Sequence, residues 1–389
     1  MNDARPRAEI VIVQTTVPEY RLRFFASLAD ALGSGLEIVS GEEDFALDVR
    51  HAHPVGYWRV RNRFLARRRL LWQSGVLRRV VGAPTAVLVL NPRILSNWFV
   101  LLARRARGRR TILWGHAWPR RGRGTATDRV RRFMRRLADT LIVYTEAEAD
   151  ELRALDPGVD VVAAPNALYP SSELGPAHTE LTTDFLFVGR LNEEKKPALL
   201  LDAFLAAEPE LPDDVRVVFL GDGPLRGPLE ERARVRGDGR VVFLGHVSDT
   251  EQLRSAYGRA IASVAPGTTG LSLIQSLGFG VPMILVREAL HGPETEAATE
   301  GANAVYVASD SVSELANALK EAAATRDAWR ARRAEIAAPI VAKYSVDAMV
   351  QAFLVALRVD VSRSSSREPN AHPRDESDES RALAGERSS

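Results

Sequence analysis

The chain contains no cysteine among its 389 residues. Disulfide bonds, thiolate zinc sites and cysteine nucleophiles are therefore excluded, and the composition fits a reducing cytoplasm. By eye, no run of apolar residues reaches the roughly 20 that span a bilayer, so we expect no transmembrane segment. Residues 1–9 are polar and lack the apolar centre of a secretory signal, so we expect no secretion. These absences predict a cytoplasmic protein.

Acidic residues are almost missing from one long region. Residues 50–136 contain 23 arginines, no lysine and one acid, Asp128. Within residues 41–84, Tyr57, Trp58, Phe64 and Trp72 lie among many of these arginines. Rings at headgroup depth and guanidinium groups on lipid phosphates favour an anionic membrane surface, here the inner face of the plasma membrane. A solvated arginine-rich face is the second interpretation; nucleic acid ranks last, because no nucleic-acid motif accompanies the charge.

A strand–helix–strand pattern stands at the centre of the chain. The apolar run 185–188 ends at Gly189, and Arg190 and Lys195 follow it. After a helical segment, the apolar run 215–220 ends in Gly221-Asp222-Gly223-Pro224. In parallel sheets ligands bind beyond the carboxyl ends of the strands, where both loops would lie. Cations on one strand end and glycines on the next favour a phosphate site over ordinary solvated loops.

Several short motifs in this half occur in one order. They are Gly189-Arg190-Leu191 with Glu194-Lys195, then Gly221-Asp222-Gly223-Pro224-Leu225, Phe243-Leu244-Gly245 and Gly280-Val281-Pro282. Residues 184–306 thereby resemble the donor half of a family 4 glycosyltransferase, a retaining enzyme, and in particular bacterial surface-polysaccharide members. The likeness is weaker over 10–166 and 343–353. It implies an α/β protein of GT-B fold, in which two Rossmann-like domains face each other across a cleft.

Length and resemblance together predict the domain organisation. A chain of 389 residues is too long for one ordinary core. We expect a Rossmann-like acceptor domain over residues 1–169, a linker over 170–183 and a Rossmann-like donor domain over 184–345. The segment 346–360 is expected to be a helix that returns to the first domain. Residues 361–389 are rich in Ser, Arg, Glu and Pro and are predicted to be disordered.

The donor site follows from charge and from the resemblance. A nucleotide sugar leaves as a diphosphate, and Arg190 and Lys195 can neutralise the charge that develops on it without a metal ion. The family resemblance implies further contacts with the nucleotide sugar. These positions are Gly189, Gly223, His246, Val247, Thr269, Gly270, Leu271, Gln275, Glu294 and Glu296. For the two glutamates we expect that one binds sugar or ribose hydroxyls; a solvated helix start is the alternative.

The sequence departs from the family at two positions. The family places two glutamates eight residues apart, where this chain has Gly267 and Gln275. An amide at 275 can still bind ribose hydroxyls, whereas a glycine at 267 cannot orient a sugar. Backbone amides at 269–271, at a helix N-terminus, could hold a phosphate instead. A non-catalytic scaffold that binds nucleotide sugar or membrane is therefore an alternative, and a sugar-nucleotide 2-epimerase is another.

Three residues of the first half are candidates for the acceptor side. His116 follows the apolar run 111–114 and would contact the sugar or the reacting hydroxyl; a structural histidine is the alternative. Arg21 and Asn91 are candidate acceptor contacts, although Arg21 could equally be a solvated arginine at a helix start. No fixed metal site is visible, because His51 and His53 alone are a weak signal. The predicted activity is metal-independent, retaining transfer from a nucleotide sugar to a glycan or lipid-linked acceptor.

Overall fold

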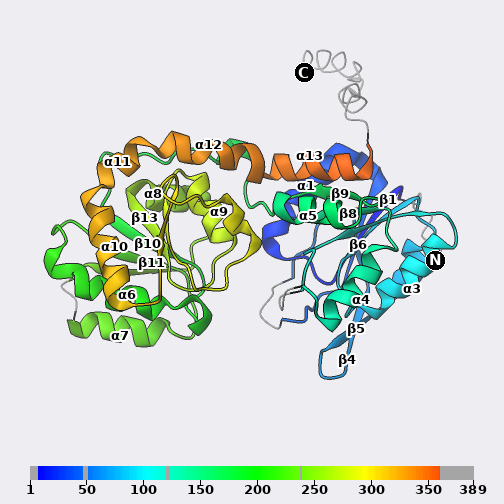
Figure 1. Ribbon diagram of the computed structural model, residues 1–389, viewed down its shortest axis with the longest axis horizontal. Helices are drawn as coiled ribbons and strands as arrows, with labels where there is room; N and C mark the ends of the chain where they lie inside the picture. The colour runs from blue at the N-terminus through cyan, green and yellow to red at the C-terminus, as the bar shows by residue number, and fades with distance from the viewer. Residues whose placement is uncertain (1–7, 47–50, 120–122, 237–238, 360–389) are drawn as a thin grey trace, which may run out of the picture.

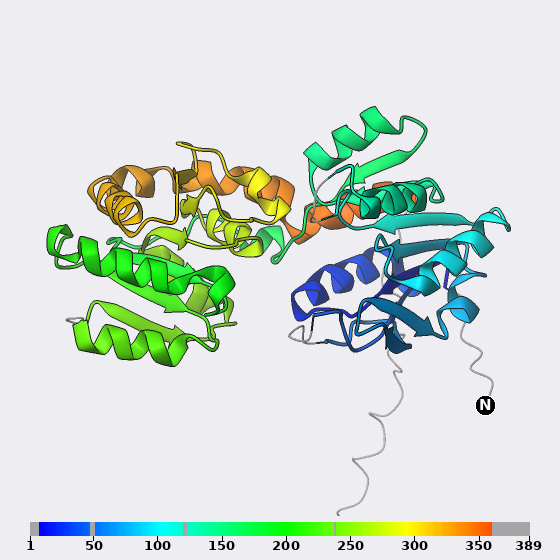
Figure 2. The same cartoon turned by 60° about the horizontal axis from the view of Figure 1, so that its bottom comes forward.

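The computed structural model describes residues 8–46, 51–119, 123–236 and 239–359. Two parallel sheets, each covered by helices, form two bodies that lie side by side (Figure 1). A view turned by 60° again shows the bodies on either side of the segments that join them (Figure 2). The predicted α/β class with two Rossmann-like units is therefore confirmed. The predicted disorder of residues 361–389 concerns a segment outside the described residues.

The first sheet has seven parallel strands in the order β3-β2-β1-β6-β7-β8-β9. Runs of Val, Ile and Leu form its centre because both faces are covered by helices. Its strands are β1 Ile10–Gln14, β2 Leu36–Ser40, β3 Tyr57–Arg59, β6 Thr85–Val89, β7 Arg110–Trp114, β8 Thr140–Val143 and β9 Asp160–Ala163. Its helices are α1 Leu22–Leu32, α2 Val76–Val80, α3 Leu95–Arg105, α4 Ala126–Arg135 and α5 Glu146–Leu155.

The second sheet has six parallel strands in the order β12-β11-β10-β13-β14-β15. Its central strand β10 begins the strand–helix–strand pattern found in the sequence. The strands are β10 Asp184–Val188, β11 Arg216–Leu220, β12 Val241–Gly245, β13 Ala260–Ala265, β14 Met283–Val286 and β15 Ala304–Val307. The helices are α6 Pro197–Ala207, α7 Arg226–Arg236, α8 Thr250–Arg259, α9 Leu271–Gly278 and α10 Val312–Ala324.

An antiparallel hairpin lies outside both sheets. Its strands are β4 Arg61–Leu65 and β5 Leu70–Ser74, and it projects from the first domain (Figure 1). The turn contains three residues with positive φ, Ala66, Arg67 and Arg68. The sequence analysis did not predict this hairpin. Arginines at exposed positions hide its weak alternation of inward and outward side chains.

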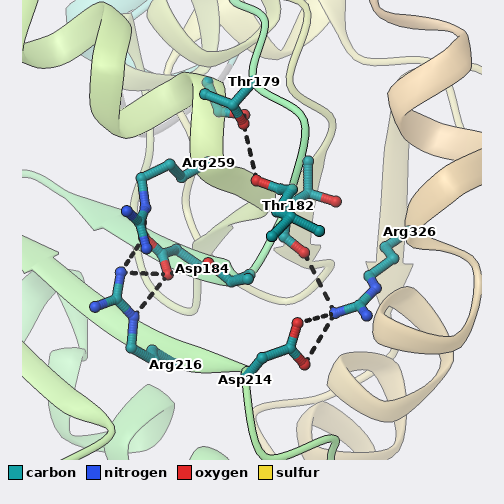
Figure 3. A network of polar contacts seen from close by, with 10 residues as sticks. Thr179, Thr182, Asp184, Asp214, Arg216, Arg259 and Arg326 are labelled. Atoms are coloured by element: carbon teal, nitrogen blue, oxygen red, sulfur yellow. Dashed lines mark hydrogen bonds and ion pairs between the residues drawn. The ribbon is translucent and has the colours of Figure 1, made fainter.

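A polar network anchors the second sheet at the amino end of β10 (Figure 3). The buried carboxylate of Asp184 accepts hydrogen bonds from Arg216 at 2.9 and 3.0 Å and from Arg259 at 3.3 Å. Nearby, Arg326 pairs with Asp214 at 2.9 Å. A buried carboxylate needs such partners because an unpaired charge is costly to bury. The network lies at the strand ends opposite the predicted site, so we assign it a structural role.

The last helices connect the two domains. After α10 the chain forms α11 Arg326–Ala331 and α12 Arg333–Tyr344, separated at Arg332. The final helix α13 Val346–Leu357 packs on the first domain, with the Phe353 ring 4.7 Å from that of Phe24 and 4.8 Å from that of Trp114. The predicted return of a C-terminal helix is therefore confirmed.

The stretch 333–357 bears on the expectation that the chain has no transmembrane segment. By length and composition it could cross a membrane, the single such stretch in the described part of the chain. However, more than half of its most apolar 18-residue window is buried within the protein, and extended backbone at Ser345 separates α12 from α13. Its apolar residues are explained by packing against both domains.

Candidate active site

The loops after β10 and β11 touch backbone to backbone. The Gly189 N–H donates to the Leu220 carbonyl at 3.0 Å, and the Leu191 N–H donates to that of Asp222 at 2.9 Å. A Cβ on Gly221 would overlap the Gly189 carbonyl oxygen, and one on Gly223 would overlap that of Leu191. These glycines are therefore required by close approach, and they hold the two predicted phosphate loops together.

Lys195 is held against the loop that follows β13. Its Nζ donates to the Thr268 carbonyl at 2.7 Å, while the Thr268 N–H donates to the Glu194 carbonyl at 3.1 Å. A Cβ on Gly267 would lie 2.6 Å from the carbonyl carbon of Lys195. The loop that carries Lys195, which we call the lysine loop, can therefore pack on this backbone only because residue 267 is a glycine, where the family has a glutamate.

The electrostatics of Lys195 reflect its partly buried position. Burial lowers the pKa of its ammonium group, and the nearby positive charge of Arg190 lowers it further. Glu194 and Glu294 act in the opposite direction. The Arg190 side chain itself is exposed. The structure therefore places both cations near each other at the carboxyl end of β10, the position that the sequence predicted for them.

Helix α9 begins beside these cations. Its N-cap residue is Gly270, which has no side chain to cap the first turn, and the positive end of a helix favours an anion. Thr269 is buried, and its carbonyl accepts the Gly292 N–H at 2.7 Å. Leu271 is the first helical residue. This geometry suits a diphosphate beside Lys195.

The two candidate glutamates have different surroundings. Glu294 is buried; its Oε1 accepts a hydrogen bond from Asn166 at 3.2 Å, and its Oε2 would lie 3.2 Å from a Cβ built on Gly270. Glu296 is exposed and accepts the backbone N–H groups of Glu146 at 3.1 Å and Ala147 at 2.8 Å, where α5 of the first domain begins. Glu294 therefore lies against the loop between β13 and α9, whereas Glu296 joins the two domains.

The positions predicted to read the nucleoside are only partly available. Gln275 is buried, and its Nε2 donates to the Tyr169 hydroxyl at 2.6 Å. Its amide therefore already binds the segment that links the domains. His246 is exposed and Val247 half-buried, directly after β12. The Gly245 carbonyl before them accepts the Gly221 N–H at 2.7 Å, so this strand end is joined to the glycine loop.

Arg21 lies inside the first domain and is not a solvated arginine. Its guanidinium donates to Gln14 at 2.9 Å and to the Tyr144 hydroxyl at 3.1 Å, and it stacks on the Trp114 ring. It also donates to Asn166 at 3.4 Å. Asn166, which the sequence analysis did not single out as a site residue, thus connects Arg21 with Glu294. Its position directly after the last strand of the first sheet was the available signal.

His116 and Asn91 follow neighbouring strands of the first sheet. The half-exposed His116 ring packs edge-on against Tyr144, with Nδ1 3.9 Å from Glu148. Burial raises the pKa of Glu148, whose carboxylate accepts the N–H groups of Ala117 and Tyr144. Asn91 Oδ1 accepts the Arg93 N–H at 3.1 Å. Both candidates therefore lie at strand ends, as predicted, and His116 has a defined orientation.

A group of metal-ligating side chains also forms in this domain. Ligand atoms of Glu42, His51 and His53 lie within 4.8 Å of one another. However, Nδ1 of His51 accepts the Val17 N–H at 3.2 Å, which leaves the proton of the neutral ring on Nε2. Cation binding through Nε2 would need the other tautomer and would break this bond. The group therefore does not fit a metal site well.

Comparisons with known proteins agree with this geometry. Residues 182–325 match the family of group 1 glycosyl transferases. A GDP-mannose-dependent alpha-(1-6)-phosphatidylinositol dimannoside mannosyltransferase of Mycobacterium tuberculosis is 36% identical over 115 residues, which is 28% of this chain and 29% of that protein. A Campylobacter jejuni N-acetyl-galactosaminyltransferase, named for a diNAcBac-PP-undecaprenol-linked glycan, is 35% identical over 99 residues, or 25% and 26% of the two chains. The matches thus span less than a third of these relatives.

Solved structures resemble the whole described fold. Anabaena HepE in complex with UDP has a TM-score of 0.66 and 14% identity, over 90% of this chain and 99% of its own. The lipopolysaccharide outer core galactosyltransferase WaaB has a TM-score of 0.59 and 13% identity, over 90% and 99%. At this identity the likeness shows the fold alone, and it confirms the predicted GT-B architecture. Residues 182–325 thus match the group 1 glycosyl transferase family, and the described fold as a whole resembles proteins of GT-B fold.

Proposed function

We propose that this protein transfers a sugar from a nucleotide-sugar donor to a glycan or lipid-linked acceptor. One observation carries the proposal: Lys195, the glycine loop after β11 and the start of α9 meet at one edge of the second sheet. Each of these elements suits a phosphate, and together they suit a diphosphate. The UDP bound in HepE supports this use of the fold.

The proposed chemistry depends on charge neutralisation. When the bond between the sugar and the diphosphate breaks, negative charge develops on the leaving phosphate. Lys195 and Arg190 would stabilise this charge, and the positive end of α9 would add to it. Glu294 lies beside the same loops, where it can accept hydrogen bonds from sugar hydroxyls. Independence of metal follows from these two cations, retention of configuration is implied by the family resemblance, and both are part of the proposal.

The acceptor is proposed to be lipid-linked and to bind at the strand ends that carry Asn91 and His116. These ends belong to the first sheet, and the Asn166–Glu294 hydrogen bond brings that domain next to the donor loops. The named acceptors of the relatives, a phosphatidylinositol dimannoside and an undecaprenol diphosphate glycan, support this class. The enzyme would then work in the cytoplasm, on the inner face of the plasma membrane.

A thermal-shift screen of nucleoside diphosphates and nucleotide sugars, in EDTA, tests the donor site. At a ligand concentration of about 100 Kd, the selected donor should stabilise the fold by roughly 2.7 kcal/mol. A shift with one nucleotide sugar would identify the base. If the folded protein responded to no donor, the scaffold interpretation would replace the enzymatic one.

Substitution of Lys195 then tests catalysis. Lys195→Ala should reduce turnover about 10²–10³-fold, as removal of one group that stabilises a developing charge does elsewhere. The matched control is Lys196→Ala, because Lys196 pairs with Asp310 at 2.5 Å, away from Thr268. Turnover that survives Lys195→Ala but is lost in Lys196→Ala would contradict the assigned role.

A further inference from the structure

Exposed apolar side chains gather on one face of the first domain. They are Leu65 of the hairpin, Phe99 and Leu102 of α3, and Val130 and Phe133 of α4. Phe99 is 55% exposed and Phe133 is 59% exposed. Large exposed aromatic side chains in a group indicate an interaction surface, whereas single ones do not.

Ring contacts make these residues one surface. The Trp98 ring of α3 stacks on Phe133 of α4 with 5.9 Å between centroids, and Trp72 of β5 lies 5.3 Å from Phe99. Hairpin, α3 and α4 also lie next to one another in Figure 1. The strand β5, the helix α3 and the helix α4 therefore present a continuous face, which we call the hairpin–α3–α4 face.

Arginines surround the apolar side chains on this face. In α4 and at its C-cap, Arg129 and Arg136 lie four and three residues from Phe133, and the neighbouring Arg132 is also exposed. In α3, Arg105 follows Leu102 at the same spacing. On the hairpin, Arg61, Arg63, Arg67 and Arg69 are exposed. Two of these charges are partly offset, because Arg132 lies 3.8 Å from the buried Asp128 and Arg136 pairs with Asp156 at 3.1 Å. The exposed arginines of the hairpin, with Arg105 and Arg129, keep the face positive.

We propose that the hairpin–α3–α4 face docks on an anionic lipid bilayer. This proposal rests on the proposed function, because it states how a lipid-linked acceptor reaches the site. Aromatic and aliphatic side chains would enter the headgroup region, and the arginines would pair with lipid phosphates. Charge complementarity selects this partner. A nucleic acid would need aromatic rings free for base stacking, whereas Trp98 and Phe133 stack on each other.

The face is directly attached to the proposed acceptor site. Arg131 of α4 donates to the carbonyl oxygens of Leu90 and His116, at 3.1 and 2.6 Å. Arg93, which follows β6, donates to the carbonyls of Arg68 and Arg69 in the hairpin, both at 2.8 Å. The strand ends with Asn91 and His116 are therefore held at a fixed position relative to the bilayer, so that a lipid headgroup can reach them.

Flotation of the full chain with vesicles tests the docking face. One set contains phosphatidylcholine alone, and the other contains added phosphatidylglycerol. We expect binding to the anionic set only, at low salt, with release as salt shortens the Debye length. Phe99→Ser combined with Phe133→Ser should reduce the bound fraction at least tenfold. Arg129→Gln combined with Arg132→Gln should reduce it and weaken its salt dependence.

Matched controls use exposed residues of the second domain. Leu290→Ser, at an 86% exposed position, and Arg234→Gln in α7 should bind vesicles as the wild type does. Equal binding by the Phe99/Phe133 variant, with an unchanged unfolding midpoint, would overturn the proposal. So would wild-type binding to RNA but not to vesicles.

Failure of docking and failure of the donor site are distinguishable. The Phe99/Phe133 variant should keep the nucleotide-sugar thermal shift, and Lys195→Ala should keep vesicle binding. A docking variant that loses both would show that the substitutions unfold the first domain, and single substitutions Leu102→Ser and Val130→Ser would then repeat the test. If these singles also left vesicle binding unchanged, the face would be excluded.

Discussion

The glycine at position 267 shows how one missing side chain shapes the site. A glutamate there, as the family has, would have its Cβ 2.6 Å from the carbonyl carbon of Lys195. The lysine loop and the loop after β13 could not then keep their present hydrogen bonds. The loss of the family's glutamate is thus coupled to the position of Lys195, and it does not by itself indicate a dead enzyme.

We therefore predict that Gly267→Glu damages the protein instead of restoring a family function. The substitution should weaken nucleotide-sugar binding at least tenfold and cost about 1–3 kcal/mol of stability, as overpacking does in other proteins. Calorimetric titration and thermal unfolding measure these effects. Gly227→Ala is the control, because a Cβ there meets no atom within 4 Å. A Gly267→Glu variant that binds its donor more tightly would contradict the packing argument.

Lys195 should also set the alkaline limit of activity. Burial lowers the pKa of its ammonium below the ordinary value of 10.5, so it loses its charge at lower pH than an exposed lysine. Turnover should fall as pH rises through that lowered pKa. The unfolded chain binds this proton more tightly than the folded chain does. The charged group therefore destabilises the fold at pH values below its folded pKa, and this effect fades as the pH rises to 10.5.

A pH–rate profile checks this prediction. In Lys195→Arg the charge persists across the alkaline range, so any remaining activity should show no such decline. If turnover fell in the same way at high pH in the wild type and in Lys195→Arg, the titrating group would be another residue.

At the scale of elements, buried strands were predicted well and the hairpin was not. Apolar runs such as 283–286 mark strands of a covered parallel sheet directly. In β4, arginines occupy the outward positions of a strand with no fully buried residue, so no apolar run is visible. The strand-end location of Lys195 and His116 was predictable for the same reason that the sheet was.

The partners of the site residues could not be predicted from local pattern. The hydrogen bond from Gln275 to Tyr169 joins residues 106 positions apart, and that from Arg21 to Asn166 joins residues 145 apart. Such contacts depend on how the two domains meet. The sequence therefore indicated which residues stand at the strand ends, whereas their burial and partners required the structure.

Helix α13 should contribute strongly to the stability of the first domain. Phe353 is fully buried among Phe24 and Trp114, whereas Val355 on the same helix is 65% exposed. We predict that Phe353→Ala lowers the free energy of unfolding by about 3–5 kcal/mol. Val355→Ala should change it by less than about 0.5 kcal/mol. Denaturant titration compares the two; equal losses would mean that the helix does not pack as described.

At the scale of the whole molecule, several contacts hold the two domains together. Glu296 bonds to the start of α5, and Arg23 pairs with Glu173 and reaches Thr250. These contacts are polar, as is common between domains that move relative to each other.

Loss of the Glu296 contact should shift the domains toward an open arrangement. We predict that Glu296→Ala increases the radius of gyration measured by X-ray scattering without donor, and raises the apparent KM for the donor. Glu300→Ala is the control, because Glu300 pairs with Arg287 of its own domain at 2.9 Å. An unchanged scattering profile would show that the remaining contacts suffice.

The return of α13 to the first domain has a consequence for synthesis on the ribosome. The groove formed by Phe24 and Trp114 is completed only by residues 346–357, which are translated after the whole second domain. At a translation rate of roughly 20 residues per second, that delay is on the order of 10 s. During this interval we expect the nascent first domain to leave these aromatic side chains uncovered, which is the kind of apolar surface that chaperones shield.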